Sequence, residues 1–93
     1  MQIYSAAVVA LNNFKNNYPD SEYLEEAYYL VIDAEYRLAE KSIQSKQAER
    51  YNAVVDYYKE FLERYPNSRF LKDAERLYAD SLVKLRMLKN PNS

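Results

Sequence analysis

The sequence predicts an all-α protein in which four antiparallel helices stack side by side as repeated hairpins. Three observations predict it. The 93 residues contain no glycine, apolar residues recur at spacings of three and four, and the chain resembles itself after an offset of 47 residues. Tight turns between strands usually need glycine, so its absence disfavours a sheet. Apolar spacings of three and four place side chains on one face of a helix.

Both copies of the 47-residue repeat contain the same proline-based turn sequence. The segment YPDS at 18–21 returns as YPNS at 65–68. A residue that precedes proline is pushed out of the helical region, so one helix should end near Tyr18 and another near Tyr65. The side-chain oxygens that follow each proline can cap a new helix, and Ser21 and Ser68 occupy equivalent places. The sequence therefore predicts two equivalent helix–turn–helix junctions.

The expected helices span about 3–18, 22–43, 48–65 and 69–88, with the least certain turn at 44–47. The second helix carries two apolar stripes instead of the single one that a surface helix needs. One stripe consists of Leu24, Ala27, Val31, Ala34 and Leu38, and the other of Tyr29, Ile32, Tyr36, Ala39 and Ile43. Two stripes indicate a helix packed between neighbours on both sides, as in a solenoid.

Composition excludes most catalytic and cofactor chemistry. The chain has no histidine and no cysteine, which removes the usual general base, thiol nucleophiles and the common zinc ligands. The net charge of −1 argues against nucleic-acid binding, which usually requires a basic face. We therefore expect no enzyme activity, no catalytic residue, no metal site and no cofactor. No apolar run is long enough to span a membrane.

The spacing around each YP turn resembles the tetratricopeptide repeat. Tyr4, Ala7, Leu11 and Phe14 precede Pro19 where that family places the apolar residues of its second helix. The period of 47 exceeds the usual 34 because LAEKSIQSKQAERY lengthens the repeat. A long first helix between YPDSEYLEEA and YPNSRFLKDAE is similar to the C-terminal repeats of the BamD family, in its Bacteroidetes version.

The resemblance implies a function and a place. Members of that family are lipoproteins of the outer-membrane β-barrel assembly machinery, with several such repeats and a lipidated N-terminal cysteine. It implies a non-catalytic scaffold on the periplasmic side of the outer membrane of a Gram-negative bacterium, with its lipid anchor upstream. The implied partners are the barrel-insertase subunit and unfolded barrel clients.

The resemblance also divides the chain. Residues 1–88 form a single repeat domain, and 89–93 are expected to be a flexible tail. Within the domain, 1–18 is the second helix of a preceding repeat, 22–65 is a full repeat with an extended first helix, and 69–88 is the first helix of the next.

A stripe along the two inner helices is the candidate partner-binding site. Its members step by three and four along one helix face and keep their character across the repeat. They are Tyr23, Glu26, Leu30, Asp33 and Arg37, with the counterparts Phe70, Asp73, Leu77, Asp80 and Lys84. Aromatic anchors above a mixed-charge floor suit a groove for a protein partner. The competing interpretation is that the charged pairs are ordinary exposed ion pairs on the helix surface, with no role in binding.

Two other features suggest contacts with proteins. The basic cluster of Lys41, Lys46 and Arg50 could meet an acidic partner, although a solvated turn explains it better. The helices at the two ends of the stack should leave apolar surface uncovered, which predicts self-association. The residues concerned are Ile3, Val8 and Val9 at one end, and Val83 and Leu88 at the other.

Two other functions remain open at this point. One is a different periplasmic tetratricopeptide-repeat adaptor, such as a cell-envelope coordinator, although such relatives tend to have shorter repeats. The other is a hydrolase with an unrecognised site, which the missing histidine, cysteine and glycine make remote.

Overall fold

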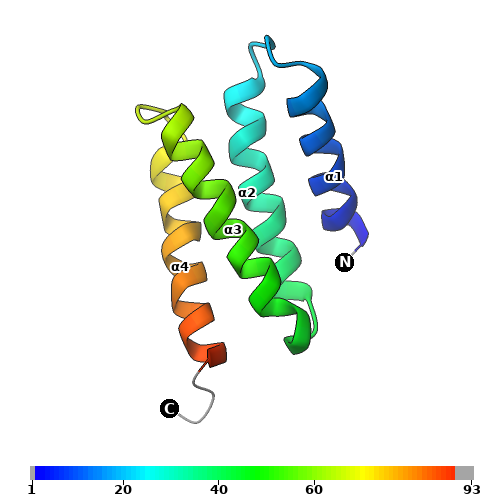
Figure 1. The fold of residues 1–93 in the computed structure, drawn as a ribbon, viewed down its shortest axis with the longest axis vertical. Coiled ribbons are helices and arrows are strands. Elements are labelled where there is room, and N and C mark those ends of the chain that lie inside the picture. The colour runs from blue at the N-terminus through cyan, green and yellow to red at the C-terminus, as the bar shows by residue number, and fades with distance from the viewer. Residues whose placement is uncertain (1, 90–93) are drawn as a thin grey trace.

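The computed structural model describes residues 2–89 and contains four α-helices in this range. They are α1 (Gln2–Asn17), α2 (Leu24–Lys41), α3 (Gln44–Arg64) and α4 (Leu71–Lys89). Consecutive helices run antiparallel and form a slab of 47 × 28 × 15 Å (Figure 1). The expected all-α class, helix number and antiparallel packing are confirmed. Most of the expected tail at 89–93 lies outside the described residues, and Lys89 belongs to α4.

The 47-residue repeat is visible in the backbone of the two YP junctions. The amide of Tyr18 donates to the Phe14 carbonyl at 2.9 Å, and that of Tyr65 donates to the Phe61 carbonyl at 2.8 Å. The next three backbone hydrogen bonds of each junction also recur at the same offset, with equal lengths. Equivalent sequences therefore build the same turn twice, which gives α1 and α3 one role in the stack and α2 and α4 another.

The helix that follows each junction begins two residues later than its serine suggested. The Ser21 hydroxyl accepts the amide of Tyr23 at 3.0 Å, within the turn, and Tyr23 itself precedes α2 without a side-chain cap. Ser68 accepts the amide of Phe70 in the same way. Each serine thus stabilises the approach to its helix, because its side chain reaches the backbone two residues ahead.

The turn between α2 and α3 is shorter than predicted, and residues 44–47 already belong to α3. The Ser42 hydroxyl bonds the Leu38 carbonyl, and Arg50 donates to that same hydroxyl. Gln47 donates from α3 to the Ala39 carbonyl at 3.1 Å. Ser42 and Gln47 thus donate hydrogen bonds to the Leu38 and Ala39 carbonyls at the end of α2. The chain can therefore reverse at Ser42 and Ile43 without a longer loop.

Helix α2 lies at the centre of the structure and contacts α1, α3 and α4. Every member of its first apolar stripe is buried. Within its second stripe, Ile32 and Ala39 are fully buried, while Ile43 is exposed in the turn. The main core cluster joins this helix to the two that follow and consists of Leu24, Tyr28, Ile32, Val54, Tyr58, Phe61 and Ala74. The two stripes therefore reflect packing on two sides, as predicted.

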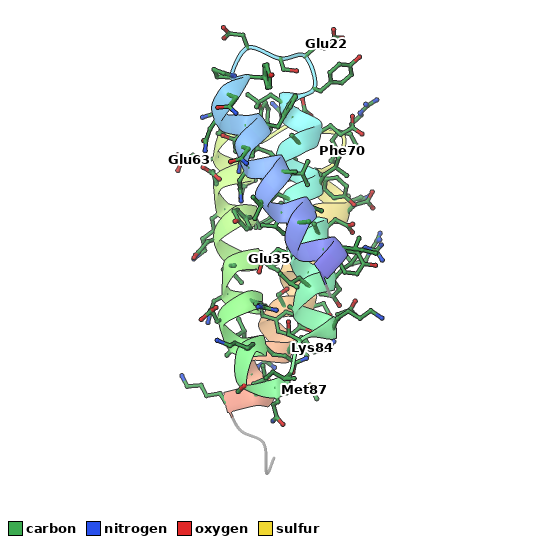
Figure 2. The ribbon with its side chains drawn as sticks, turned by 90° about the vertical axis from the view of Figure 1, so that its right-hand side faces the viewer. Glu22, Glu35, Glu63, Phe70, Lys84 and Met87 are labelled. Atoms are coloured by element: carbon green, nitrogen blue, oxygen red, sulfur yellow. The ribbon has the colours of Figure 1, made fainter. Side chains whose placement is uncertain are left out.

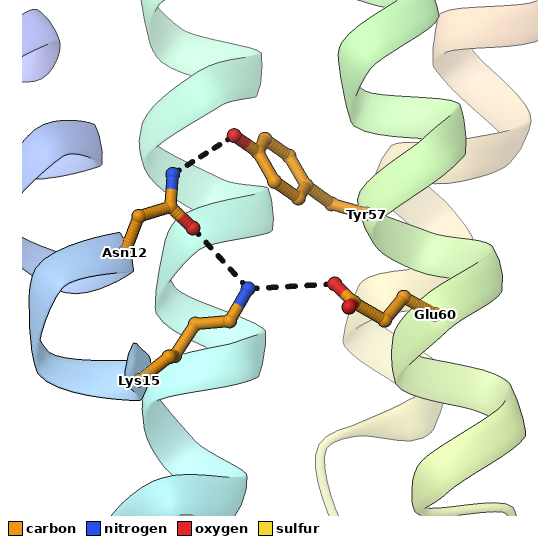
Figure 3. A network of polar contacts seen from close by, with 4 residues as sticks. All are labelled: Asn12, Lys15, Tyr57 and Glu60. Atoms are coloured by element: carbon orange, nitrogen blue, oxygen red, sulfur yellow. Dashed lines mark hydrogen bonds and ion pairs between the residues drawn. The ribbon is translucent and has the colours of Figure 1, made fainter. Parts of the chain in front are cut away.

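Side chains from α1 and α3 meet across α2 (Figure 3). Asn12 donates to the Tyr57 hydroxyl at 2.9 Å, and Lys15 lies 3.4 Å from the Glu60 carboxylate and 3.2 Å from the Asn12 side-chain oxygen. The Lys15 ammonium also sits 4.2 Å above the Tyr28 ring. Burial lowers the pKa of Lys15, which the Glu60 carboxylate partly offsets. This network fixes the position of α1 relative to α3.

The described helices also bear on membrane insertion. None of those between residues 2 and 89 is long and apolar enough to cross a membrane.

Candidate partner-binding site

The predicted stripe lies on the side of the slab formed by α2 and α4, although Leu77 and Lys84 of α4 also approach residues of α3. Figure 2 shows Phe70 and Lys84 on this side and Glu63 of α3 on the opposite one. Helix α2 packs against α1, α3 and α4, while Tyr23, Leu30 and Arg37 remain exposed. A helix packed on two sides keeps its remaining face for solvent or for a partner.

The α2 half of the stripe is accessible. Tyr23 and Arg37 are exposed, Leu30 is 38% exposed, and Glu26 and Asp33 are half-buried. Arg37 donates to Asp33 at 2.9 Å, and this hydrogen bond raises the pKa of the Arg37 guanidinium. An exposed pair of this kind adds only about 0.3–0.5 kcal/mol to the stability of the fold. Its main consequence is to hold both charged groups in one orientation.

The α4 half of the stripe is partly used by the fold itself. The Phe70 ring stacks on Tyr29 of α2, with centroids 5.1 Å apart and planes 8° from parallel. Asp80 accepts a hydrogen bond from the Tyr36 hydroxyl. Burial together with this bond raises the pKa of Tyr36, so the phenol stays protonated and keeps donating. Phe70 and Asp80 therefore join the two inner helices, a role that the sequence did not reveal.

The other α4 members differ in accessibility. Asp73 is exposed and lies 3.4 Å from Arg76, whereas Leu77 is half-buried against the core. Lys84 lies 3.3 Å from Asp80. Burial by itself would lower the pKa of Lys84, but Tyr51 and Asp80 outweigh it and raise the pKa.

Two hollows gather stripe residues near the YP junctions. One is an apolar groove of about 270 Å³ between α1 and α2, lined by Leu11, Phe14, Tyr23, Glu26, Ala27 and Leu30. The other, of about 420 Å³, joins the two junctions and is lined by Glu22, Tyr23, Glu25, Glu26, Arg69 and Phe70. Tyr23 and Glu26 belong to both. These two residues therefore mark the part of the stripe where an incoming side chain finds apolar and charged groups together.

Lys84 lies apart from these residues. It lines a separate hollow of about 410 Å³ at the other end of α2 and α4, with Glu40, Gln44, Gln47, Tyr51, Met87 and Leu88. The hollows along the predicted stripe therefore form two areas, one at each end of α2 and α4. Leu11 and Phe14 also line the apolar groove, which their sequence pattern does not reveal, because helical spacing of apolar residues indicates core.

One member of the basic cluster, Arg50, has a structural role. Arg50 bonds Ser42 in the α2–α3 turn, while Lys41 and Lys46 are exposed. This supports the interpretation of the cluster as a solvated turn. Among residues 2–89, no group of three histidine, cysteine, aspartate or glutamate residues is placed to hold a metal ion.

Comparison with known protein families shows which family the chain belongs to. The profile of the YfiO family, described as outer membrane lipoprotein, matches residues 1–85. The chain belongs to this family. YfiO and BamD are two names for it, so the resemblance inferred from the YP turns and the long inner helix is confirmed at the family level. No curated protein gives a significant match to the chain. The YfiO family assignment indicates the outer membrane of the cell envelope as the location and proteins as the partners.

Proposed function

We propose that the chain is a non-catalytic scaffold of the β-barrel assembly machinery on the periplasmic side of the outer membrane. The single observation that carries the proposal is the YfiO family match over residues 1–85. The fold supports it, because helices stacked around a central α2 present one broad surface. The Bacteroidetes version of the family, a lipid anchor upstream and the division of the chain into repeats are parts of this proposal.

The partner we propose is the barrel-insertase subunit, held by the stripe on α2 and α4. The α2 members supply the affinity, since Tyr23 offers an exposed ring beside the apolar groove and Leu30 extends that groove. The ion pair of Asp33 and Arg37 then adds a charge pattern that selects the partner. Binding requires little reordering, because Leu30, Asp33 and Arg37 project from a helix that packs against its neighbours.

The test is a binding titration of the full chain against the periplasmic domains of the insertase subunit. The variant Tyr23→Ala combined with Asp33→Arg removes the exposed ring and reverses the charge at the centre of the stripe. Neither residue belongs to the core, so the fold should persist, which circular dichroism can check. We expect the dissociation constant to rise at least tenfold, the equivalent of about 1.4 kcal/mol.

The matched control is Asp56→Arg, which makes the same charge reversal at an exposed site on α3. It should bind as the unmodified chain does. Equal losses in both variants would indicate a general effect of charge, and full affinity in the stripe variant would overturn the proposed surface.

A further inference from the structure

Helices α1 and α3 are successive copies of one repeat helix, yet their backbones do not pack against each other. Among residues 2–89, the backbone of α1 packs against α2 alone, whereas that of α3 packs against α2 and α4. The other pair of copies, α2 and α4, does have direct backbone packing, reinforced by the stacked rings of Tyr29 and Phe70. In the described part of the chain, only side chains therefore reach directly from α1 to α3.

Those side chains converge on one ammonium group (Figure 3). The Lys15 side chain is 8% exposed, and its Nζ lies 3.4 Å from the Glu60 carboxylate and 3.2 Å from Asn12 Oδ1. The same Nζ lies 4.2 Å from the ring centroid of Tyr28 and 5.2 Å from that of Tyr57. Hydrogen bonds and ion pairs weaken when their geometry changes, so these contacts together specify one place for the ammonium.

The surroundings of this ammonium do not fully compensate for its burial. Burial lowers the pKa of Lys15, and the nearby guanidinium of Arg64 acts in the same direction. Arg64 also lies 5.0 Å from the centroid of the Tyr28 ring, so two cations share one aromatic side chain. Glu60 opposes these effects without cancelling them. Apolar residues can replace a buried ion pair of this kind with little or no loss of stability.

The repeat shows that the helix itself does not need these polar residues. The 47-residue offset places Leu62 at the position of Lys15, and Lys59 at that of Asn12. Helix α3 forms and ends in the same YP turn as α1, although both positions differ. The network is therefore an addition to the repeat pattern, and its role concerns the placement of α1 and not its formation.

The apolar contacts of α1 are poorly suited to select a single placement. Attraction between apolar surfaces has no preferred direction and depends mainly on the area buried. Residues 6–10 of α1, with the sequence AAVVA, offer only small side chains to interlock with a neighbouring helix. A rotation of α1 that separates Lys15 from Glu60, by contrast, leaves a buried charge without its partner, which is strongly unfavourable.

We propose that the network around Lys15 selects one rotation of α1 against α3 without adding net stability to the fold. The curvature and twist of a helical stack follow from the rotation between successive copies of the repeat. Because α1 and α3 are such copies, the network sets the pitch of the stack at this point. Other rotations are excluded by the penalty on an unpaired ammonium. This device concerns the shape of the stack and does not rest on binding of the insertase.

The experiment replaces the network by apolar residues and measures placement and stability separately. The variant Asn12→Leu with Lys15→Met keeps similar side-chain lengths and good helix formers. The chain has no cysteine, so spin labels on Ser5→Cys of α1 and Asn52→Cys of α3, both exposed sites, report a single interhelix distance. The labelled chain with the network intact should give one narrow distance distribution. The apolar variant should give a shifted or an additional distance population, while its urea midpoint stays equal or rises.

Two further variants complete the test. The matched control, Asn13→Leu with Lys72→Met, makes the same two exchanges at exposed sites outside the network, and it should leave the distance distribution unchanged. Glu60→Gln removes the partner and leaves the ammonium in place, so the urea midpoint should fall. Adding Lys15→Met to Glu60→Gln should restore the midpoint, because no buried charge then lacks its partner.

Three outcomes would overturn the inference. The first is an unshifted, single distance population in the apolar variant, because apolar packing alone would then place α1. The second is a lower urea midpoint in that variant, because the network would then be an ordinary source of stability. The third is a Glu60→Gln chain as stable as the unmodified one, because the ammonium would then not need its partner.

Discussion

Glu35 is the residue whose environment fits its chemistry least. Its side chain is 6% exposed on α2, among the apolar residues that pack this helix on two sides. Burial raises the pKa of its carboxyl, Arg50 partly offsets the rise, and Glu49 adds to it. The repeat has leucine at the equivalent place, Leu82. The position therefore does not require a charge for the helix to form.

Glu35→Gln should make the fold more stable at pH 7. A raised pKa means that the folded chain holds this proton more tightly than the unfolded chain, so ionisation above the folded-state pKa costs stability. That loss develops as the pH rises from the unfolded value of 4.5 through the higher folded value, and glutamine avoids it. Urea titrations at pH 7 and pH 4 measure the difference.

The gain should shrink toward pH 4, where the carboxyl is largely protonated in both states. The control is Glu40→Gln, an exposed site on the same helix. A gain of equal size at both pH values would contradict burial as the cause.

At the scale of the element, helices of equal sequence pattern differ in how firmly they are held. The stripes of α1 and α3 are copies, yet only the α3 stripe is enclosed by helices on both sides. Tyr58, for example, stacks on Tyr78 of α4 and is 6% exposed, whereas its counterpart Leu11 is half-buried. Position in the stack, and not local pattern, sets the energetic weight of each side chain.

Equivalent phenylalanines should therefore contribute unequally to stability. Phe61→Ala empties a fully buried site and should cost about 3–5 kcal/mol of unfolding free energy. Phe14→Ala removes a half-buried ring and should cost roughly half of that or less. Denaturant unfolding of both variants at low concentration provides the comparison, and equal losses would mean that α1 is enclosed as fully as α3.

At the scale of the whole molecule, the stack has a centre and two ends. Helices α2 and α3 share the main core, while within residues 2–89 the backbone of α1 packs against that of α2 alone. Side chains of Asn12, Lys15, Tyr57 and Glu60 link α1 to α3. In such quasi-linear folds each element depends mainly on its neighbours. The end helices should therefore open more readily than the middle ones.

Hydrogen exchange should reveal this gradient. We expect the slowest amides in α2 and α3, and exchange at least tenfold faster in α1 and in the last turns of α4, because these segments open without disrupting the core. A low chain concentration is used, so that association of copies does not protect the ends. Uniform exchange across all four helices would instead indicate a single cooperative unit.

The sequence predicted most of the fold because its signals are local. The YP junctions and the helical apolar spacing act within a few residues, so the four helices and their order followed from them. The α2–α3 turn was placed too late, since nothing local marks it. The C-terminal end of α2 is stabilised by Gln47 and Arg50 of α3, which donate hydrogen bonds to the Ala39 carbonyl and the Ser42 hydroxyl.

The candidate site was predictable only as a set of residues on one helix face. Tyr23 and Leu30 are accessible as expected, but Phe70 and Asp80 are engaged by Tyr29 and Tyr36 across the helix pair. Those partners lie more than 40 positions away in the sequence, and no pattern within either helix reports such a contact.

The sequence by itself determined the helices, the repeat and the family, because apolar periodicity, the prolines of the two turns and composition are local properties of the chain. Only the tertiary structure decided which copy of each repeated surface is covered. Coverage depends on what packs alongside in space, so two stripes with the same pattern become a closed core on α3 and an open groove on α1.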